Sequence, residues 1–439
     1  MTSPTPASST ALLTDRYELT MLQAALRSGA AQRECVFEVF ARRLPEGRRY
    51  GVVAGTGRIA EAISDFRFGE PELEALRERG AVDEATLRFL AGYRFTGDVW
   101  GYAEGECFLP GSPLVVVEGS FAEAVVLETL VLSILNHDAA VASAASRMTA
   151  AAGDRPCIEM GSRRTHEQAA VTAARAAYIA GFAATSNLEA GRRYGVPTAG
   201  TSAHAFTLLH DSERAAFEAQ VASLGPGTTL LVDTYDVSAA VRLAVEVAGP
   251  GLGAVRLDSG DLLVQAREVR ALLDSLGATS TRIVVTSDLD EHAIAALAAA
   301  PVDAYGVGTS LVTGSGAPTA GLVYKLVARA DAGGALVPVE KKSKDKTSIG
   351  GRKWATRRID ADGVAEAEVV GVEAPPAGDD NDRPLLVPLV RKGELAWSAD
   401  LEQARERHAR SRAELPPTAL QLSRGGPAIP TIYSRAVQR

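Results

Sequence analysis

Short apolar runs alternate with longer, partly polar stretches through the middle of the chain, from residue 155 to residue 309. The stretches between the runs, such as residues 167–180 and 262–276, are rich in alanine and leucine and are long enough to form helices. Strands that alternate with helices predict βα units and a parallel sheet. Because about seven units follow one another, the pattern favours a closed (β/α) barrel over an open sheet. The predicted strands are residues 157–160, 182–185, 196–198, 230–233, 254–258, 283–286 and 304–307.

The segments on either side of this region have a different pattern of hydrophobic and polar residues. Before the alternating region, the chain predicts an amphipathic helix ending near residue 29 and a half-buried strand over residues 35–41. Helices over residues 56–95 and strands between residues 95 and 119, separated by glycine and proline turns, follow. After the alternating region, residues 322–339 again have the pattern of strands, and residues 400–414 that of a charged helix. We therefore expect a small β-rich domain wrapped on the barrel.

Residues 120–150 predict one or two helices, and three polar residues interrupt their apolar face. These residues are Asn136, His137 and Asp138. Polar side chains that compete for backbone hydrogen bonds are more common at helix ends than inside helices. We interpret the interruption as a helix cap or break in preference to a functional site.

Composition limits the class of protein. A chain of 439 residues is too long for one ordinary core and should form two or three domains. Its 46% hydrophobic and 23% charged residues are normal for a soluble globular protein. The net charge of −8 argues against general binding to nucleic acid or to a membrane surface. No apolar run approaches the length of a membrane span, so we expect a cytoplasmic protein with neither kind of partner.

The three cysteines, Cys35, Cys107 and Cys157, have no CxxC spacing. This spacing predicts that the cysteines are small buried hydrophobic residues in a reducing compartment. It indicates neither a disulfide framework nor a zinc site. Two basic segments remain open to two interpretations each. The arginines between residues 42 and 49 form either a solvated turn or a local positive site. Residues 341–353 either fold over a phosphate or form a mobile hairpin.

The predicted strands of the alternating region end in polar residues. In a barrel of parallel strands the chemistry gathers at the carboxyl ends of the strands. Here those ends carry arginines, acids, hydroxyls, glycines and one histidine. Such a combination indicates a site for an anionic, phosphate-bearing substrate.

His204 is the sharpest candidate among these residues. It directly follows the small residues 200–203 at the end of a predicted strand, where backbone can approach a ligand and a helix N-terminus offers free N–H groups. An imidazole at that place could act as a base or as a nucleophile that carries a phosphoryl group. The alternative is a histidine that is bonded within the first turn of its helix. Its place at the catalytic end of a barrel favours a functional role.

Arg256 and Asp258 share one face of a predicted strand, since alternate side chains of a strand point to the same side. Asp261 follows after a Ser-Gly turn. Arginine pairs bidentately with phosphate, and the acids could hold Mg²⁺ with its waters beside a pyrophosphate. The alternative is an Arg–Asp pair that only closes the barrel. Residues 306–310 form a glycine turn before a presumed helix, which suits phosphate binding by backbone amides.

Four motifs occur in a fixed order: EMGSRR at residues 159–164, GTSAH at 200–204, RLDSGD at 256–261 and GVGT at 306–309. With the TDRY segment at residues 14–17 they resemble the nicotinate phosphoribosyltransferases, of the type II phosphoribosyltransferase group. The resemblance covers nearly all the chain up to residue 353. It implies an α/β fold, an irregular (β/α) quasi-TIM barrel with an N-terminal α/β sandwich domain and a small C-terminal β-rich and helical extension.

The expected division of the chain follows from this fold. We predict a disordered tail at residues 1–12 and a sandwich domain at residues 13–119. The catalytic quasi-barrel should occupy residues 120–335, and an extension at residues 336–439 should pack on the N-terminal domain.

The resemblance also implies a reaction. ATP, as co-substrate, phosphorylates His204. With Mg²⁺, 5-phosphoribosyl 1-pyrophosphate (PRPP) and nicotinate then bind, and the ring nitrogen of nicotinate displaces pyrophosphate at C1 of the ribose. The product is nicotinate mononucleotide, which enters NAD salvage. The active sites are shared between the two chains of a homodimer.

Carried over by position, Tyr17 of the neighbouring subunit would stack on the pyridine ring and Met160 would line its other face. Arg163 and Arg256 would bind PRPP or the nicotinate carboxylate. The resemblance implies catalytic roles for His204, Arg256 and Asp258, and metal binding by Asp258 and Asp261. It implies further substrate binding by Thr185, Ser186 and Thr201. The residues that would bind phosphate are Gly260, Ser287, Asp288, Gly308 and Thr309.

Two positions depart from the family pattern. Met160 stands where relatives often have an aromatic residue, and residues 136–138 differ from an expected aromatic-glutamine pair. Three other functions compete with the main interpretation. A nicotinamide enzyme should have an acid where Ser186 stands, and a quinolinate enzyme should have more basic residues. A barrel that binds without catalysis would have no need of an intact His204.

Overall fold

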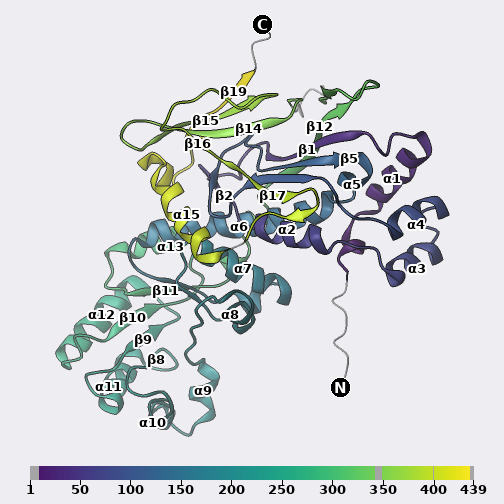
Figure 1. Cartoon of the computed structure of the whole chain (residues 1–439). Coiled ribbons are helices and arrows are strands. Elements are labelled where there is room, and N and C mark those ends of the chain that lie inside the picture. Colours follow the sequence, from purple (N-terminus) through teal and green to yellow (C-terminus); the bar gives the residue numbers. More distant parts are fainter. Residues whose placement is uncertain (1–8, 342–348, 399, 436–439) are drawn as a thin grey trace. The chain divides into compact units, whose positions relative to one another are not determined.

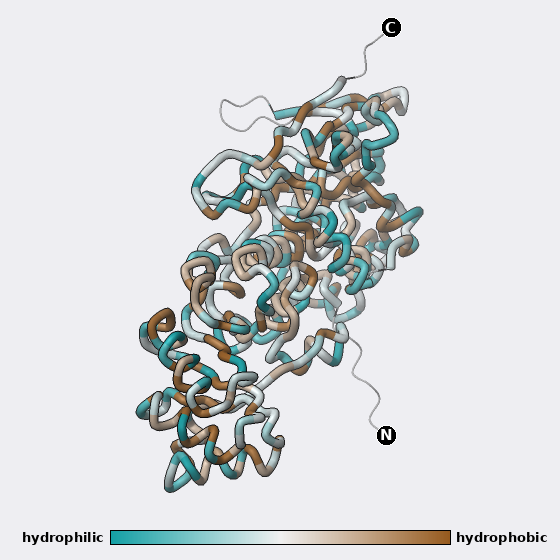
Figure 2. Tube along the Cα trace, turned by 90° about the vertical axis from the view of Figure 1, so that its left-hand side faces the viewer, coloured by the Kyte–Doolittle hydropathy of each residue, from teal (hydrophilic) through white to brown (hydrophobic). Residues whose placement is uncertain are grey.

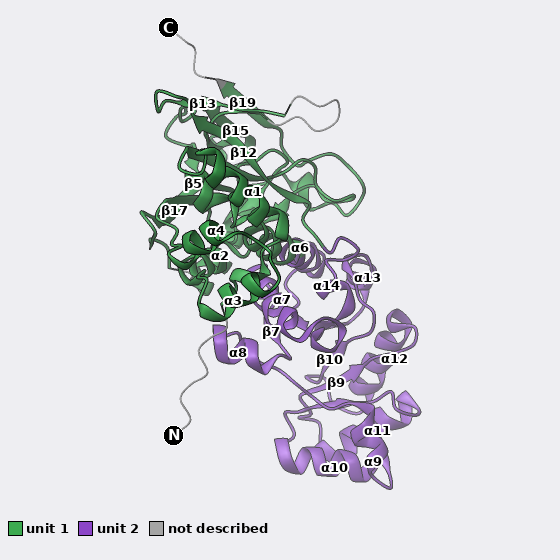
Figure 3. Cartoon of the chain, turned by 90° about the vertical axis from the view of Figure 1, so that its right-hand side faces the viewer, with its two compact units in different colours: residues 1–140, 319–439 green, residues 141–318 purple. Residues whose placement is uncertain are grey.

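The computed structural model describes residues 9–341, 349–398 and 400–435. The chain forms two compact units: unit 1 combines residues 1–140 and 319–439, and unit 2 consists of residues 141–318 (Figure 3). The division falls inside helix α6 (Glu128–Ala152). The domain limits that we expect from the sequence, at residues 120 and 335, remain a prediction.

Six parallel strands form the centre of unit 2, and their sheet curls into a half-barrel (Figure 1). The sheet has the strand order β7-β6-β11-β10-β9-β8. Its strands carry apolar side chains that are almost completely buried, such as Val255, Leu257, Ile283 and Val285, as a parallel sheet covered on both faces requires. The strands are β6 (Cys157–Glu159), β7 (Ala184–Thr185), β8 (Thr229–Leu231), β9 (Ala254–Leu257), β10 (Arg282–Val285) and β11 (Ala304–Val307).

One predicted strand is wrong, and with it the expectation that the apolar runs alone close a barrel. Residues 196–198 contribute only an isolated bridge between Thr185 and Thr198. Thr185 donates its backbone N–H to the Pro197 carbonyl at 2.9 Å, but Pro197 itself has no N–H to donate to a neighbouring strand. Within the described residues no ladder joins β7 to β8, so the sheet stays open.

Helices follow the strands of unit 2, and most begin with a side chain that caps the first turn. Asn187, Ser212, Asp236, Asp261 and Asp290 each accept a hydrogen bond from a backbone N–H of the helix that follows. The helices are amphipathic, and hydrophobic and hydrophilic residues alternate along them in Figure 2. They are η2 (Ser162–Arg164), α7 (Glu167–Ile179), α8 (Leu188–Tyr194), α9 (His204–Leu209), α10 (Glu213–Leu224), α11 (Val237–Ala248), α12 (Leu262–Ser275), α13 (Glu291–Ala296), η3 (Leu297–Ala299) and α14 (Thr309–Val312).

Unit 1 is built on a seven-stranded sheet with the order β13-β12-β1-β5-β3-β17-β18. Its paired strands are antiparallel. Strands from both ends of the chain meet in it, because β1 pairs with β12 and β3 pairs with β17. The strands are β1 (Glu34–Ala41), β3 (Asp98–Tyr102), β5 (Val115–Ser120), β12 (Leu322–Ala330), β13 (Leu336–Pro338), β17 (Leu386–Arg391) and β18 (Glu394–Leu395).

Helices and two smaller sheets complete unit 1. Its helices are η1 (Ala11–Leu13), α1 (Arg16–Ser28), α2 (Thr56–Asp65), α3 (Glu70–Glu78), α4 (Glu84–Ala91), α5 (Phe121–Val125), the first part of α6, α15 (Leu401–Ala413) and η4 (Pro417–Leu420). A four-stranded sheet contains β16 (Arg383–Pro384), β14 (Lys353–Ile359), β15 (Ala365–Val372) and β19 (Thr431–Arg435), and a two-stranded one contains β2 (Gly51–Val52) and β4 (Cys107–Phe108). The predicted helices over residues 56–95 and the strands near 95–119 and 322–339 are confirmed. No described helix is both long and apolar enough to cross a membrane.

The predicted cap or break at residues 136–138 is wrong, because α6 runs through it without interruption. The polar side chains make contacts inside unit 1 instead. Asp138 accepts a hydrogen bond from the Arg58 guanidinium at 2.7 Å, and its side chain is only 1% exposed. Asn136 accepts one from the backbone N–H of Leu322 at 2.8 Å. Tertiary partners therefore satisfy groups that an isolated helix would place at its end.

Several other predictions can be compared with the described residues. The three cysteines are buried and free, as expected. Residues 9–12, which we assigned to a disordered tail, are ordered, and Ala11 is fully buried. The arginine turn is only partly solvated, since Arg48 is 6% exposed and Arg49 donates to the Ser423 carbonyl at 3.4 Å. Most of the basic loop at 341–353 lies outside the described residues.

A buried ion pair joins the C-terminal segment to the rest of unit 1. Arg357 on β14 and Glu368 on β15 are both fully buried, and the Arg357 guanidinium donates to Glu368 at 3.0 Å. It also donates to the Cys107 carbonyl at 2.8 Å, and the Tyr102 hydroxyl donates to the other Glu368 oxygen at 2.6 Å. A buried charge must be paired and hydrogen-bonded. The partners that meet this need lie on β3 and β4, so the bonds connect the four-stranded sheet to those strands.

Replacing Arg357 by Met should destabilise the protein by about 3–5 kcal/mol, because it leaves the Glu368 charge buried without its partner. Urea unfolding followed by circular dichroism measures the loss. Arg358→Met is the matched control: its side chain is 40% exposed and lies 3.8 Å from Asp382, so its loss should stay below about 1 kcal/mol. Equal losses for the two variants would contradict the role given to burial.

Candidate active site

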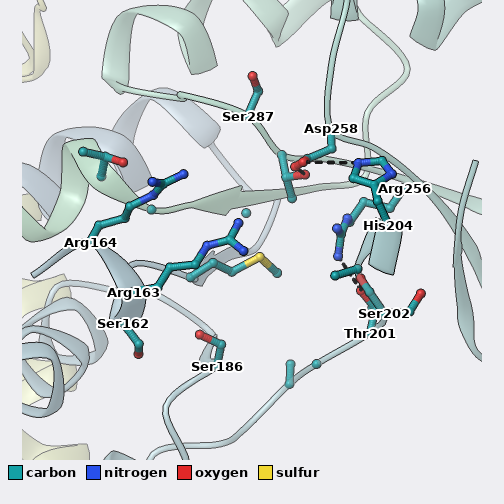
Figure 4. A pocket seen from close by; sticks show the side chains of 18 of the residues that line it. Ser162, Arg163, Arg164, Ser186, Thr201, Ser202, His204, Arg256, Asp258 and Ser287 are labelled. Atoms are coloured by element: carbon teal, nitrogen blue, oxygen red, sulfur yellow. Dashed lines mark hydrogen bonds and ion pairs between the residues drawn. The ribbon is translucent and has the colours of Figure 1, made fainter. Parts of the chain in front are cut away.

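A pocket of about 560 Å³ opens in unit 2 among residues that follow the carboxyl ends of its strands (Figure 4). Arginines, carboxylates and hydroxyls face it from several strand ends, as the sequence predicts for a parallel sheet. The pocket is lined by Met160, Ser162, Arg163, Arg164, Ser186, Ala199, Gly200, Thr201, Ser202, Ala203, His204, Arg256, Asp258, Thr286, Ser287, Asp288, Gly306, Gly308 and Thr309.

His204 is the first residue of α9, and its ring reaches toward the ends of two strands. Nδ1 lies 3.1 Å from the Thr234 hydroxyl. Nε2 lies 3.9 Å from Asp233 Oδ1 and 3.9 Å from Asp258 Oδ2, and Figure 4 shows His204 and Asp258 facing each other. The ring is therefore held by residues after β8 and β9 and not by a bond within its own helical turn. Its side chain remains 39% exposed, which leaves access from the pocket.

The two carboxylates beside His204 are tied together. Asp233 Oδ2 accepts hydrogen bonds from the Asp258 backbone N–H at 2.9 Å and from the Ser259 hydroxyl at 2.7 Å. The Thr286 hydroxyl donates to Asp258 Oδ1. Asp233 Oδ1 is buried and has no hydrogen-bond partner among the described residues. A buried carboxylate oxygen without a donor is costly, so this oxygen is poised for a cation or a donor at the pocket.

Two arginines bring positive charge to the same pocket. Arg256, on β9, donates to the Thr201 hydroxyl at 2.6 Å, and its buried Nε has no partner in the described part of the chain. Burial lowers the pKa of Arg256 and the charge of Arg163 adds to this effect, while Asp258 and Asp233 oppose it. Arg163 itself is exposed on η2. Two guanidinium groups at one pocket favour an anion between them.

Glycines allow close packing on another wall of the pocket. A Cβ atom at Gly306 would come within 2.8 Å of Met160 Sδ and 2.4 Å of Thr286 Cγ2. A Cβ atom at Gly161 would come within 2.4 Å of Val312 and 2.9 Å of the Gly308 carbonyl oxygen. The glycines thus bring the turns after β6 and β11 together and let the Met160 side chain lie across Gly306.

Ser287 lines the pocket with a strained backbone. Its φ of 129° lies in a region that L-residues rarely adopt. Such conformations cost on the order of 1–3 kcal/mol and concentrate at functional sites. Ser287 directly follows Thr286, which holds Asp258, and precedes Asp288, which also lines the pocket. The strained turn therefore fixes two pocket residues next to the carboxylates.

Eleven of the residues expected from the sequence line this pocket together, namely Met160, Arg163, Ser186, Thr201, His204, Arg256, Asp258, Ser287, Asp288, Gly308 and Thr309. Four others do not. Thr185 is fully buried. Gly260 precedes Asp261, which caps α12 by accepting from the Val264 N–H at 3.2 Å, so the structure does not bring Asp258 and Asp261 together at the pocket. Tyr17 lies on α1 in unit 1 and is 46% exposed.

Sequence reasoning gave no role to Asp233 and Thr234, although both hold His204 in place. The signal was present, because they directly follow the apolar run at residues 230–232 and stand at the end of a strand, as Asp258 does. Eight further residues that line the pocket had no role predicted for them. These are Ser162, Arg164, Ala199, Gly200, Ser202, Ala203, Thr286 and Gly306.

Comparisons with known proteins show which family the chain belongs to. Residues 12–136 match the family model of the nicotinate phosphoribosyltransferase (NAPRTase) N-terminal domain. A nicotinate phosphoribosyltransferase of Mycobacterium tuberculosis is 61% identical over 429 residues, which cover 96% of this chain and 94% of that protein. One of Bacillus subtilis is 37% identical over 361 residues, covering 80% of this chain and 74% of that protein.

The fold has a solved counterpart as well. The crystal structure of human nicotinic acid phosphoribosyltransferase superposes with a TM-score of 0.82 at 27% identity, covering 96% of this chain and 97% of that one. Because relatives above 30% identity span most of the chain, the alignment extends far beyond the matched N-terminal domain. The chain is an enzyme that belongs to the nicotinate phosphoribosyltransferase family.

Proposed function

We propose that this enzyme transfers the phosphoribosyl group of PRPP to nicotinate, giving nicotinate mononucleotide and pyrophosphate, and that it couples this transfer to ATP through a phosphohistidine. The observation that carries the proposal is the position of His204, whose Nε2 faces the carboxylates of Asp233 and Asp258 in a pocket that also contains Arg256. This arrangement suits phosphate-bearing substrates, because the arginines can pair with their oxygens.

The nicotinate carboxylate is best placed near Arg163. This guanidinium is exposed at the pocket, and the hydroxyl-bearing Ser186 lines the same pocket without adding a negative charge. Met160 offers a polarizable, apolar surface for one face of the pyridine ring. Nicotinamide lacks the charge that Arg163 would bind, so we propose nicotinate as the preferred substrate.

The residues beside His204 fit a Mg²⁺ ion. Among the described residues no three His, Cys, Asp or Glu side chains are placed to hold a metal by themselves. Mg²⁺ needs no such cluster, since it is usually held by one or two carboxylates together with waters and substrate phosphates. Asp258 lines the pocket and Asp233 Oδ1 lacks a partner among the described residues, so we propose these two as ligands in preference to Asp261. When bound, the ion would neutralise charge on the phosphates.

His204 is proposed to carry a phosphoryl group and not to act as a base. The pyridine nitrogen already has a lone pair and needs no deprotonation to attack C1. Nε2 would attack the γ-phosphorus of ATP, so that an N–P bond forms while the bond to the bridging oxygen breaks and ADP leaves with the electron pair. Such a transfer needs mainly positioning and charge neutralisation. Water would later attack the phosphorus, release inorganic phosphate and restore the imidazole.

A homodimer with shared sites is proposed from the surface of the N-terminal segment. Leu13, Tyr17 and Met21 stand four residues apart and are 68%, 46% and 36% exposed. Leu13 belongs to η1 and the other two to α1, and exposed apolar side chains that gather on a surface favour contact with another chain. A second copy would bring its Tyr17 to the pyridine ring, as the resemblance implies.

The remaining expectations are proposals of the same kind. We infer that the half-barrel and the segment at 196–198 together make the irregular quasi-TIM barrel of the family. We also place the enzyme in the cytoplasm, which the three buried, free cysteines support.

Nicotinate should be turned over with at least about tenfold higher kcat/KM than nicotinamide, because losing a hydrogen bond to a charged group costs about 1.5–3 kcal/mol. Steady-state assays with ATP, PRPP and each of nicotinate, nicotinamide and quinolinate measure the preference. Equal kcat/KM for nicotinate and nicotinamide would contradict the proposal that Arg163 binds the nicotinate carboxylate. No turnover of any of the three would favour a binding protein without catalysis.

Incubation with ATP labelled at the γ position should place an acid-labile, base-stable label on the protein, because N–P bonds break in acid and survive base. His204→Ala should take up no label and lose ATP hydrolysis. The matched control is His210→Ala in the following turn, whose ring contacts the Phe206 carbonyl at 2.8 Å and should not be needed. Label that persists in His204→Ala, or survives acid as a serine ester does, means that another residue is modified.

Mixing inactive Tyr17→Ala chains with inactive His204→Ala chains should restore part of the activity, because one of the two sites in a heterodimer would then contain both native residues. Each variant incubated alone is the control. Subunit exchange is verified separately with differently tagged chains. Proven exchange without recovery would count against a shared site.

A further inference from the structure

Glu159, the last residue of β6, is a buried acid next to the pocket that the proposed reaction does not use. It is 1% exposed and is not one of the residues that line the pocket. Its Oε1 accepts a hydrogen bond from the backbone N–H of Gly161, and its Oε2 accepts one from the hydroxyl of Thr185. No cation pairs with it in the part of the chain that the structure describes. A buried carboxyl held only by neutral donors is costly for the fold, so its presence calls for a reason other than stability.

The two donors belong to two different turns. Gly161 lies in the turn after β6, which continues into η2 and carries Arg163. Thr185 ends β7, and its hydroxyl accepts a hydrogen bond from the Asn187 backbone N–H at 2.9 Å. The Ser186 backbone N–H donates to the Glu159 carbonyl oxygen at 2.8 Å. The side chain and the backbone of Glu159 therefore hold both turns at once.

A further hydrogen bond joins the same two turns. The Asn187 side-chain amide donates to the Ser162 hydroxyl at 3.0 Å, so the two turns are joined both through Glu159 and directly. Both turns contribute to the pocket: Arg163 lines it from the first, together with Met160, Ser162 and Arg164, and Ser186 lines it from the second (Figure 4). Because both turns are fixed to one carboxyl group, the separation of the Arg163 and Ser186 side chains depends on it.

We propose that Glu159 is a positioning residue that sets the spacing between Arg163 and Ser186 and thereby the affinity of the pocket for the carboxylate of the pyridine substrate. The inference rests on the proposed function for the identity of that substrate. Burial raises the pKa of Glu159, while the bonds from Thr185 and Gly161 oppose the shift. The acid touches no reacting atom and acts only through the two turns.

The amide of glutamine cannot replace this carboxyl group without loss. A carboxylate offers an acceptor oxygen to each turn, whereas an amide offers one oxygen and one donor group. In Glu159→Gln the oxygen can keep the Gly161 contact, but the amide nitrogen cannot accept the hydrogen bond that the Thr185 hydroxyl donates to Glu159. Thr185→Val removes the same contact from the other side and keeps the shape of the side chain. Both variants should therefore give the same kinetic signature.

Steady-state kinetics test the inference. Glu159→Gln and Thr185→Val should each raise KM for nicotinate about tenfold, the factor expected when a hydrogen bond to a charged group is weakened. In Glu159→Gln, KM for PRPP and ATP hydrolysis without nicotinate should stay within about twofold of the unmodified enzyme, since His204 is held by Thr234 and not by these turns. Thr281→Val is the matched control: Thr281 is 1% exposed at the other end of the sheet, beside the start of β10, and its hydroxyl has no partner among the described residues.

Hydrogen exchange measured by mass spectrometry provides a readout that needs no activity. Peptides that contain Gly161 and Asn187 should exchange faster in Glu159→Gln than in the unmodified enzyme, and those around His204 should not change. Unchanged exchange in both turns, an unchanged KM for nicotinate, or equal increases of KM for nicotinate and PRPP would overturn the inference. An unmodified enzyme that fails to use nicotinate would refute the proposed function instead, and the exchange result would still decide whether Glu159 joins the turns.

Discussion

The direction of the strands in unit 2 is the constraint on which the site depends. Six parallel strands end at one edge, so the residue that follows each strand must appear there whatever its distance along the chain. Asp233 and Asp258 follow neighbouring strands β8 and β9, and the backbone N–H of one bonds the carboxylate of the other. Their alignment lets both face the ring of His204 at equal distance. The parallel order of the strands therefore determines where the pocket lies, and the individual side chains determine what it can bind.

This constraint also explains what the sequence could and could not reveal. Arg256 and Asp258 were predictable, because alternation in a strand places them on one face. Six of the seven predicted strands form the half-barrel sheet, Pro197 has no N–H for a ladder at residues 196–198, and closure of the barrel stays a prediction. Residues 136–138 were misinterpreted, because the partners of Asp138 and Asn136 come from distant segments of unit 1. Local pattern identifies an element, but only tertiary contacts decide whether a polar residue interrupts it. The role of Tyr17 depends on a second chain and stays a prediction.

Buried charge has opposite uses in the two units. In unit 1 the Arg357 and Glu368 charges neutralise each other, and their further bonds with Tyr102 and Cys107 connect the four-stranded sheet to β3 and β4. In unit 2 the buried Oδ1 of Asp233 and the buried Nε of Arg256 have no hydrogen-bond partner among the described residues. Groups left in this state cost stability, and a site accepts that cost when a ligand supplies the missing partners. The charges of Arg357 and Glu368 therefore stabilise the fold, whereas Asp233 and Arg256 keep polar atoms that a ligand could pair with.

The chemistry of the site follows from this division of charge. The chain carries a net charge of −8, so a pocket for polyanionic substrates needs a local excess of positive charge, which Arg163 and Arg256 provide. In the proposed function, arginines alone would not couple ATP to PRPP, because their charge does not change when ATP reacts. Coupling requires a group that changes charge when ATP reacts, placed where PRPP also binds. In the proposed function His204 is this group, because phosphorylation would place a further anion beside two carboxylates. That change would compete for the same cation and the same arginines as PRPP, so the state of one residue can alter how tightly the pocket holds its substrate.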